Sequence, residues 1–308
     1  MIQNSGAISQ QFLTNLQLLQ QQMATTQQQI SSGTKISQAS DAPNSVGDVL
    51  QLESDLGRVS QVTSNLNLVS GEVNSAESAL QSATQLLDQV ASLAAQGVGN
   101  TVSTASRSTF SQQVGQILST MVSTSQTQFN GAYVFGGDQS TSPSYQVDFT
   151  NPNGVDRLTT TQSTRLIQDA SGITFSVSKT AQDIFDHRNS DDTLASDNIF
   201  AAVNSLRIAL ANNDQPGISA AIASIKSAQD YLSQQLAFYG GVQNQISNAL
   251  NVAQKFQLQD KASLSQIKDT DVAAASIAMS QQQASYQAAI QAESAMPRTS
   301  LFSYLSGN

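Results

Sequence analysis

Cysteine and tryptophan are both absent from this sequence of 308 residues, and charged residues make up only 11% of it. Without cysteine, the chain can form no disulfide bond and offers no thiol nucleophile or thiolate metal ligand. A single histidine, His187, excludes a metal site built from several histidines. We interpret His187, which stands between an aspartate and an arginine, as a polar loop residue.

Long apolar runs are missing too. No stretch approaches the roughly 18–20 apolar residues of a transmembrane helix. The first thirty residues lack the basic segment and the short apolar stretch of a cleaved signal peptide. The formal net charge is −9, and the thirteen lysines and arginines are scattered, so no basic stripe could follow a phosphate backbone. The sequence therefore predicts neither membrane insertion nor nucleic-acid binding.

Neutral polar residues take the place of the missing charge. The chain has 42 glutamines and 46 serines, so amides and hydroxyls hydrate much of its surface. A surface with few like charges repels its own copies only weakly. This composition is compatible with a protein that packs against copies of itself.

Helical periodicity dominates the first 131 residues. Apolar or small residues recur at spacings of three and four along residues 12–30, which predicts a helix that ends at Ser31-Ser32-Gly33. We assign residues 1–42 to a terminal helical segment. Residues 43–131 are predicted to form long helices, the first of which ends near Gly97. Its regular positions are Val73, Ala76, Leu80, Ala83, Leu87, Val90 and Ala94.

The pattern changes between residues 132 and 198. Residues 132–135, 145–149 and 173–177 alternate with a period of two, and turn-forming residues separate them. Short alternating runs with such punctuation are typical of β-strands. We expect a small β-rich insert here, and its higher charge density suits an exposed domain.

Helical periodicity returns in residues 199–262 and again in the terminal segment 263–308. Residues 218–258 would form a helix about 60 Å long, whereas a compact chain of this size has a radius of gyration of roughly 19 Å. The sequence therefore predicts a mainly α fold, an elongated antiparallel bundle or coiled-coil rod formed by the two arms. The β-rich insert would lie in the middle of the chain, and both termini would lie at one end of the rod.

The two ends of the chain share an unusual lack of charge. Residues 1–34 and 272–292 contain no acidic, basic or histidine residue. Their few large apolar side chains cannot offset about 1–2 kcal/mol of backbone entropy per residue, so we expect them to fold on assembly with other subunits. The predicted assembly interface is Phe12, Leu16, Leu19, Met23, Ile30, Val272, Met279, Tyr286 and Ile290. A second predicted patch, for an export chaperone or another partner, is Leu301, Phe302, Tyr304 and Leu305.

No arrangement of residues points to catalysis. Asp183, Asp186 and the pair Asp191-Asp192 lack the glycine-centred spacing of a calcium loop, and we interpret them as solvated loop acids. Gly240-Gly241 follows no strand and precedes no lysine, so it is no phosphate loop. The G-x-S-x-G motif of hydrolases is absent. We therefore expect a protein that is not an enzyme and binds no cofactor or metal.

Four short segments resemble the bacterial flagellin-like family. Residues 30–43 read Ile-Ser-Ser-Gly-Thr-Lys-Ile-Ser-Gln-Ala-Ser-Asp-Ala-Pro, similar to the N-terminal signature of flagellins and hook-associated proteins. Residues 129–137 resemble the Phe-Gly-Gly entry into an outer domain. Residues 239–246 resemble the Leu-Gly-Ala-x-x-Asn-Arg-Leu motif, with Gln245 where arginine is usual. Asp41-Ala42-Pro43 and the ending at residues 300–305 are more similar to hook-associated proteins than to flagellin.

The resemblance implies a structural subunit of the bacterial flagellum, outside the cell, that joins the hook to the filament. Its implied partners are copies of itself, a neighbouring hook-associated protein, filament flagellin, an export chaperone and the flagellar type III export apparatus, which takes unfolded chains without a cleaved signal. The nearest alternative is flagellin itself, the filament subunit. Two others stay open: a secreted coiled-coil adhesin, and an insert that binds a ligand or catalyses a reaction.

Overall fold

The computed structural model describes residues 2–295, which fall into two compact units. Unit 1 combines residues 1–57 and 258–308, and unit 2 is the continuous stretch 58–257. The main helices are α1 (Ile2–Ser32), α2 (Val46–Gly97), α3 (Thr104–Ser125), α4 (Ala181–Phe185), α5 (Ile199–Ala211), α6 (Gln215–Lys268) and α7 (Val272–Ala295). The strands are β1 (Gln128–Phe129), β2 (Ala132–Tyr133), β3 (Tyr145–Val147), β4 (Val155–Arg157), β5 (Leu166–Gln168) and β6 (Thr174–Ser176). The prediction of a mainly helical chain with a small β-rich insert is confirmed.

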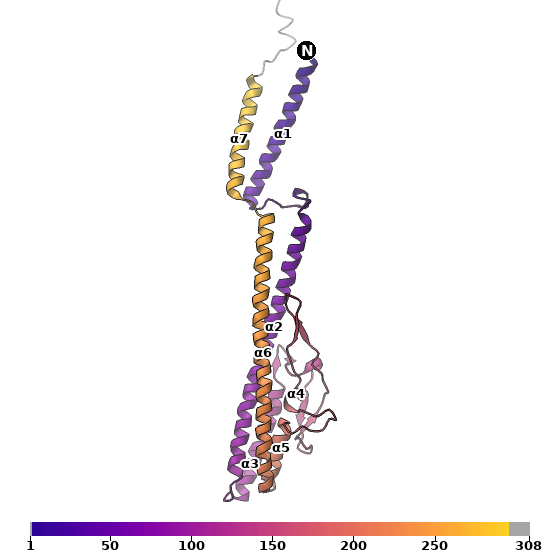
Figure 1. Ribbon diagram of the computed structural model, residues 1–308, viewed down its shortest axis with the longest axis vertical. Coiled ribbons are helices and arrows are strands. Elements are labelled where there is room, and N and C mark those ends of the chain that lie inside the picture. Colours follow the sequence, from indigo (N-terminus) through magenta and orange to yellow (C-terminus); the bar gives the residue numbers. More distant parts are fainter. Residues whose placement is uncertain (1, 296–308) are drawn as a thin grey trace, which may run out of the picture. The chain divides into compact units, whose positions relative to one another are not determined.

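Unit 2 holds the apolar core. Its helices α2, α3, α5 and α6 run alongside one another, and the insert covers one side of them (Figure 1). The seven regular positions predicted between Val73 and Ala94 are all buried, because the three-and-four spacing gives α2 one continuous apolar face. On α6 the same spacing predicted the buried face only in part. It placed Ile218, Ile225, Leu232, Tyr239 and Ile246 there correctly, whereas Ile222 is 37% exposed, Gln229, Leu236 and Gln243 are half-buried, and Ala221, Ala228, Gln235 and Val242 are buried in their place.

The insert is built from three two-stranded antiparallel pairs, β1 with β2, β3 with β4, and β5 with β6. Asn130-Gly131 closes the first pair, and both residues have positive φ, which suits a two-residue hairpin turn. The predicted strand at residues 132–135 ends at Tyr133. Val134 and Phe135 instead enter the core, where Phe135 meets the rings of Phe185 and Tyr239 edge-on.

Four further elements depart from the sequence-based expectation. β4 and β5 were not predicted, because neither lies in a run that alternates with a period of two. α4 was missed because it is only five residues long, although the Thr180 hydroxyl accepts from the Asp183 amide and the Asp183 carboxylate accepts from the Thr180 amide. α6 is longer than the predicted 218–258 and begins at Gln215, since Pro216 fits the first turn of a helix.

Glycines in the helices of unit 2 fall into two kinds. A Cβ added at Gly71 of α2 would lie 2.7 Å from the ring of Phe129, so only glycine admits this contact. A Cβ added at Gly240 or Gly241 of α6 would meet nothing within 4 Å. A side chain at Gly71 therefore requires the Phe129 ring to shift, whereas the Gly240-Gly241 pair meets no such constraint in unit 2.

Alanine is expected to act in opposite directions at these positions. Glycine inside a helix costs about 1 kcal/mol relative to alanine, so Gly241→Ala should raise the free energy of unfolding by about 0.5–1 kcal/mol. Gly71→Ala should lower it, because Phe129 must move away. Urea unfolding of the full-length variants measures both changes, and a loss of stability in Gly241→Ala would show that the glycine pair has an unrecognised role in the fold.

Candidate assembly interface

α1 and α7 pair along one seam of each helix, and we call these two helices the terminal pair (Figure 1). The seam of α1 uses the predicted positions. They are half-buried or, for Thr26, buried: Phe12, Leu16, Leu19, Met23, Thr26 and Ile30. On α7, Ala275 is buried, and Met279, Gln282, Tyr286 and Ala289 are half-buried. The structure thus brings most of the predicted interface residues onto the contact between these two helices.

Two predicted interface residues lie elsewhere on α7. Val272 is 48% exposed and Ile290 is 43% exposed, so neither belongs to the seam of the terminal pair. The seam passes instead through Ala275, Met279, Gln282, Tyr286 and Ala289. Large apolar side chains on the outside of α7 remain available to another protein surface.

The described side chains of the terminal pair form no apolar core. Among them, none belongs to either cluster of buried apolar residues, both of which lie within unit 2. Among the side chains that the structure describes in this pair, the two that are buried are Thr26 and Ala275, 8% and 9% exposed. Each fully buried leucine-sized side chain contributes about 1.5–3 kcal/mol, so this pair gains little of that stabilisation on its own.

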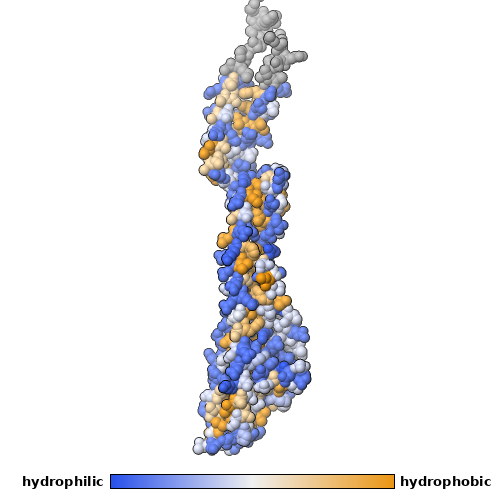
Figure 2. Space-filling view, in the orientation of Figure 1, coloured by the Kyte–Doolittle hydropathy of each residue, from blue (hydrophilic) through white to orange (hydrophobic). Residues whose placement is uncertain are grey.

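Apolar side chains cover part of the outside of the terminal pair. Leu13 and Leu18 of α1 are 51% and 54% exposed, and Ile277 of α7 is 62% exposed. Figure 2 shows apolar side chains, coloured orange, on the surface of this pair. Since residues 1–34 and 272–292 contain no charged side chain, another neutral surface can cover these helices without burying an unpaired charge.

Hydrogen bonds fix the chain that follows α1. The helix ends at Ser32, and Gly33 comes next with a φ of 71°. The Gly33 N–H donates to the Gln29 carbonyl at 2.9 Å, which makes Gly33 a glycine cap of the usual left-handed kind. The Lys35 amide donates to the Lys268 carbonyl at 2.8 Å, and the Lys35 Nζ donates to the Gln266 carbonyl at 2.9 Å. The Lys35 side chain thereby satisfies a free carbonyl at the C-terminal end of α6.

Asp41 closes the loop between α1 and α2. Its carboxylate accepts from the Ser37 amide and hydroxyl and from the Gln38 amide, at 2.9, 3.0 and 2.9 Å. These bonds, the Ser37 amide first, lower the pKa of Asp41 below its usual value of 3.8. The segment that resembles the family's N-terminal signature therefore has a structural role, because it fixes the chain between the two helices.

The Asp41 bonds predict how this loop responds to acid. A carboxyl whose pKa is lowered by folding adds stability above its unfolded pKa, and that stability is lost as the pH falls through the folded pKa. We expect the amide-exchange protection of Ser37 and Gln38 to decrease from about pH 5 downward. In Asp41→Asn, protection should be lower at pH 7 and should change little with pH. Equal protection in both proteins at pH 7 would contradict this role.

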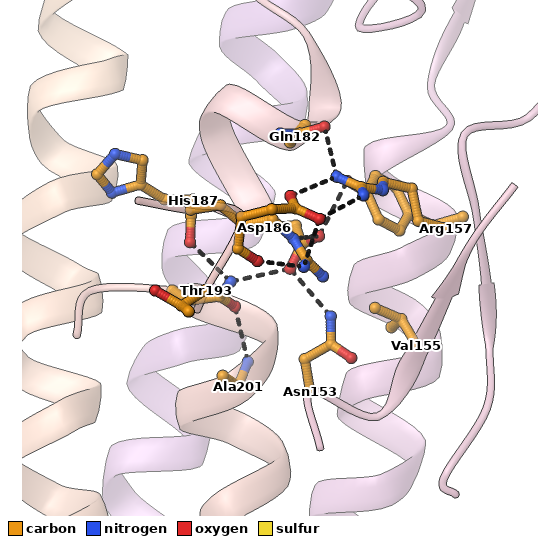
Figure 3. Close-up of polar contacts among 12 residues, drawn as sticks. Asn153, Val155, Arg157, Gln182, Asp186, His187, Thr193 and Ala201 are labelled. Carbon is orange, nitrogen blue, oxygen red and sulfur yellow. Dashed lines mark hydrogen bonds and ion pairs between the residues drawn. The ribbon is translucent and has the colours of Figure 1, made fainter. Parts of the chain in front are cut away.

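A second polar cluster fixes the insert (Figure 3). The Asp186 side chain is completely buried, and its carboxylate accepts from four side chains. They are Arg188 Nε at 2.8 Å, Asn198 Nδ2 at 2.8 Å, Asn153 Nδ2 at 2.9 Å and the Tyr145 hydroxyl at 3.2 Å. Burial and the neighbouring Asp186 charge raise the pKa of Tyr145. Asp186 thus joins segments of the insert to the start of α5 through its own bonds.

His187 and two neighbouring aspartates also have polar partners. His187 Nδ1 lies 2.6 Å from Asp197 Oδ1, and its ring stacks on Tyr231 with centroids 4.5 Å apart. Burial raises the pKa of Tyr231 to about 12. Arg157 pairs with Asp192 at 2.9 Å and lowers the pKa of that carboxyl. Within residues 2–295, no group of three or more potential metal ligands gathers.

Two other predictions concern membranes and the C-terminus. In the part of the chain that the structure describes, no helix is both long and apolar enough to cross a membrane. The predicted patch of Leu301, Phe302, Tyr304 and Leu305 lies outside the described residues.

Comparison with known families identifies the class of protein. Residues 4–140 match the bacterial flagellin N-terminal helical region, and residues 222–305 match the bacterial flagellin C-terminal helical region. The two matches together cover more than half of the chain, so it belongs to the bacterial flagellin family. No curated protein sequence matches it.

Solved structures support the same fold. A flagellar hook-associated protein from Vibrio parahaemolyticus is 18% identical, with a TM-score of 0.64, and the match covers 74% of this chain and 100% of that one. Flagellar hook-associated protein 3 from Legionella pneumophila is 12% identical, with a TM-score of 0.60, covering 71% and 98%. FlgL from Bacillus cereus is 14% identical, with a TM-score of 0.55, covering 71% and 100%. The chain is thus a flagellin-like structural protein of the flagellum with a fold similar to that of hook-associated proteins.

Proposed function

We propose that this protein is an adaptor that joins the flagellar hook to the filament and assembles through its terminal helices. The observation that carries the proposal is the state of the terminal pair. It has no charged side chain along residues 1–34 and 272–292, no fully buried large apolar residue among those described, and exposed leucine and isoleucine side chains on its outside. Such a pair is stabilised when copies of the chain and neighbouring subunits surround it.

Sequence details favour a junction subunit over flagellin, the second candidate. Asp41-Ala42-Pro43 and the ending at residues 300–305 resemble hook-associated proteins. The similar solved structures of the preceding section include proteins described as hook-associated. In this proposal the partners are copies of the chain, a neighbouring hook-associated protein and filament flagellin, and the protein acts outside the cell without catalysing a reaction.

Export is the other part of the proposal. The chain would leave the cell unfolded through the flagellar type III apparatus without a cleaved signal peptide. The apolar side chains of residues 301–305 would bind an export chaperone before secretion and would pack against other subunits afterwards. Removal of residues 298–308 should then impair export or junction formation but leave the melting temperature of unit 2 unchanged.

A deletion strain distinguishes the two candidates. Loss of a junction protein should leave cells with hooks, no filaments, and flagellin monomers in the medium. Loss of flagellin should leave hooks and no flagellin to secrete. Complementation with the wild-type gene should restore filaments. If the strain secretes no flagellin and complementation restores its secretion, the chain is the filament subunit and the adaptor proposal is wrong.

A further inference from the structure

The exposed side of α6 carries a neutral ridge that unit 2 itself does not use. Residues 231–254 contain no charged side chain. Within them, exposed residues recur at spacings of three and four and form what we call the α6 ridge: Gln234, Ala237, Gly241, Asn244 and Asn248. The middle of this ridge is the Gly240-Gly241 pair, where an added Cβ would meet nothing within 4 Å. The backbone of α6 is therefore open to close approach at this point.

The α6 ridge faces away from α2. Gln243 Nε2 donates to Asn74 Oδ1 at 2.7 Å and also to Glu77, so Gln243 lies on the side of α6 that contacts α2. Gly241 is two residues earlier, about 200° around the helix. The ridge thus lies on the flank of α6 that is opposite to α2.

A neutral groove lies on the other side of α2. Two cavities follow each other between α2 and α3, with volumes of about 470 and 500 Å³. Nine α2 residues line them, and six of these recur at spacings of four and three: Ser75, Ala79, Ser82, Leu86, Gln89 and Leu93. The other three are Asn74, Ser78 and Ser92. No charged side chain lines either cavity. We call this surface the α2–α3 groove.

The acidic side chains of α2 beside the groove point towards α6 and away from the groove. Glu77 accepts from Gln243, and Asp88 accepts from Gln229 at 2.8 Å, so both carboxylates face α6. Ser75 and Ala79 are each two residues from Glu77 and therefore lie on the opposite side of α2. The groove and the ridge occupy different flanks of unit 2, and each is free of charge.

We propose that the α6 ridge of one copy docks into the α2–α3 groove of the next copy. A charged partner would lose its hydration in the groove without gaining an ion pair, which excludes the charged faces of other helices. The α6 ridge is neutral, and its residues recur at spacings of three and four as the groove residues of α2 do. At its centre the two glycines leave the backbone uncovered by side chains. Because the two surfaces differ, the contact is head to tail, and repetition generates a ring or a helical array.

The two surfaces also lie at the same height in unit 2. Asn74 lines the first cavity and accepts from Gln243, which is two residues from Gly241. Neighbouring copies can therefore stand side by side with little axial shift between them. This inference rests on the self-assembly part of the proposed function and names the surfaces that unit 2 would use in it.

Disulfide cross-linking of the full-length chain tests the contact, since the natural chain has no cysteine. Gly241→Cys and Ser78→Cys proteins, one carrying a size tag, are mixed under assembly conditions and oxidised. Ser78 lines the first cavity. Ala95→Cys is the matched control, because Ala95 is exposed on α2, lines neither cavity, and is about five full turns from Glu77, on the side of α2 that faces α6. We expect at least tenfold more mixed disulfide with Ser78→Cys than with Ala95→Cys.

Equal yields with the two partners, or a predominance of Gly241→Cys homodimers, would overturn the inference. Leu18→Cys on the terminal pair reports assembly independently. If Leu18→Cys proteins cross-link but the Gly241 and Ser78 pair does not, the groove assignment is wrong and the proposed function stands. If no cysteine pair cross-links, self-assembly fails as well.

A substitution without cysteine gives a second measurement. Gly241→Leu should not lower the urea midpoint of unit 2, because the position is open and leucine favours a helix more than glycine does, and it should reduce assembly at least tenfold. Ala95→Leu adds the same side chain on the exposed side of α2 away from the groove and should leave assembly unchanged. Normal assembly of Gly241→Leu would overturn the inference.

Discussion

Serine in place of Leu19 is expected to abolish attachment of the protein to the flagellum while its thermal unfolding midpoint stays nearly unchanged. Leu19 lies half-buried on the seam of the terminal pair, whose described residues contribute nothing to the apolar clusters of unit 2. The apolar area that the substitution removes is fully covered only after assembly. A leucine-sized loss of about 1.5–3 kcal/mol applies to every subunit, so its effect on a multi-subunit structure is large. Phe12→Ser should behave in the same way.

Leu80→Ala is the control for this experiment. Leu80 is fully buried in the core of unit 2, and such a substitution typically costs about 2–5 kcal/mol of stability. Its melting temperature should fall clearly, in contrast to that of Leu19→Ser. If Leu19→Ser destabilises the monomer as much as Leu80→Ala does, Leu19 belongs to an ordinary core and the interface assignment is wrong.

The second large effect is expected at Asp186. Asp186→Ala leaves Arg188 without its carboxylate and removes the acceptor shared by Asn153, Asn198 and the Tyr145 hydroxyl. Breaking a buried ion pair in this way costs about 3–5 kcal/mol. Urea unfolding monitored by tyrosine fluorescence measures the loss.

Asp191→Ala provides the matched control, because Asp191 is exposed and bonds only to Thr193 among the interactions seen. We expect a small change there. A loss under 1 kcal/mol in Asp186→Ala would mean that the buried cluster does not hold the insert to α5.

The long helices could be predicted from the sequence because each of them repeats one local pattern of apolar residues. The seam from Val73 to Ala94 and the break at Gly33 both follow from residue spacing and glycine chemistry. The predicted interface residues of α7 divide into two groups. Met279 and Tyr286 lie on the seam of the terminal pair, whereas Val272 and Ile290 are exposed outside it.

The Asp186 cluster shows what sequence patterns do not contain. Its donors come from positions 145, 153, 188 and 198, and no local spacing relates them. The acids near residue 186 were interpreted as solvated loop residues, which is wrong for Asp186 because its side chain is completely buried. One local signal did exist in this region: Thr180 followed three residues later by Asp183 is a capping pattern, which could have revealed α4.

Hydrogen exchange of the dilute full-length monomer tests the central claim, that the terminal pair is an assembly element without a core of its own. Exchange requires local opening, whose free energy is low where few apolar contacts are buried. We expect the amides of α1 and α7 to exchange at least a hundredfold faster than those around Leu80 of α2 and Ile246 of α6. In the assembled state their exchange should slow to that of the core. Equal protection of α1 and of the Leu80 segment in the monomer would contradict the account.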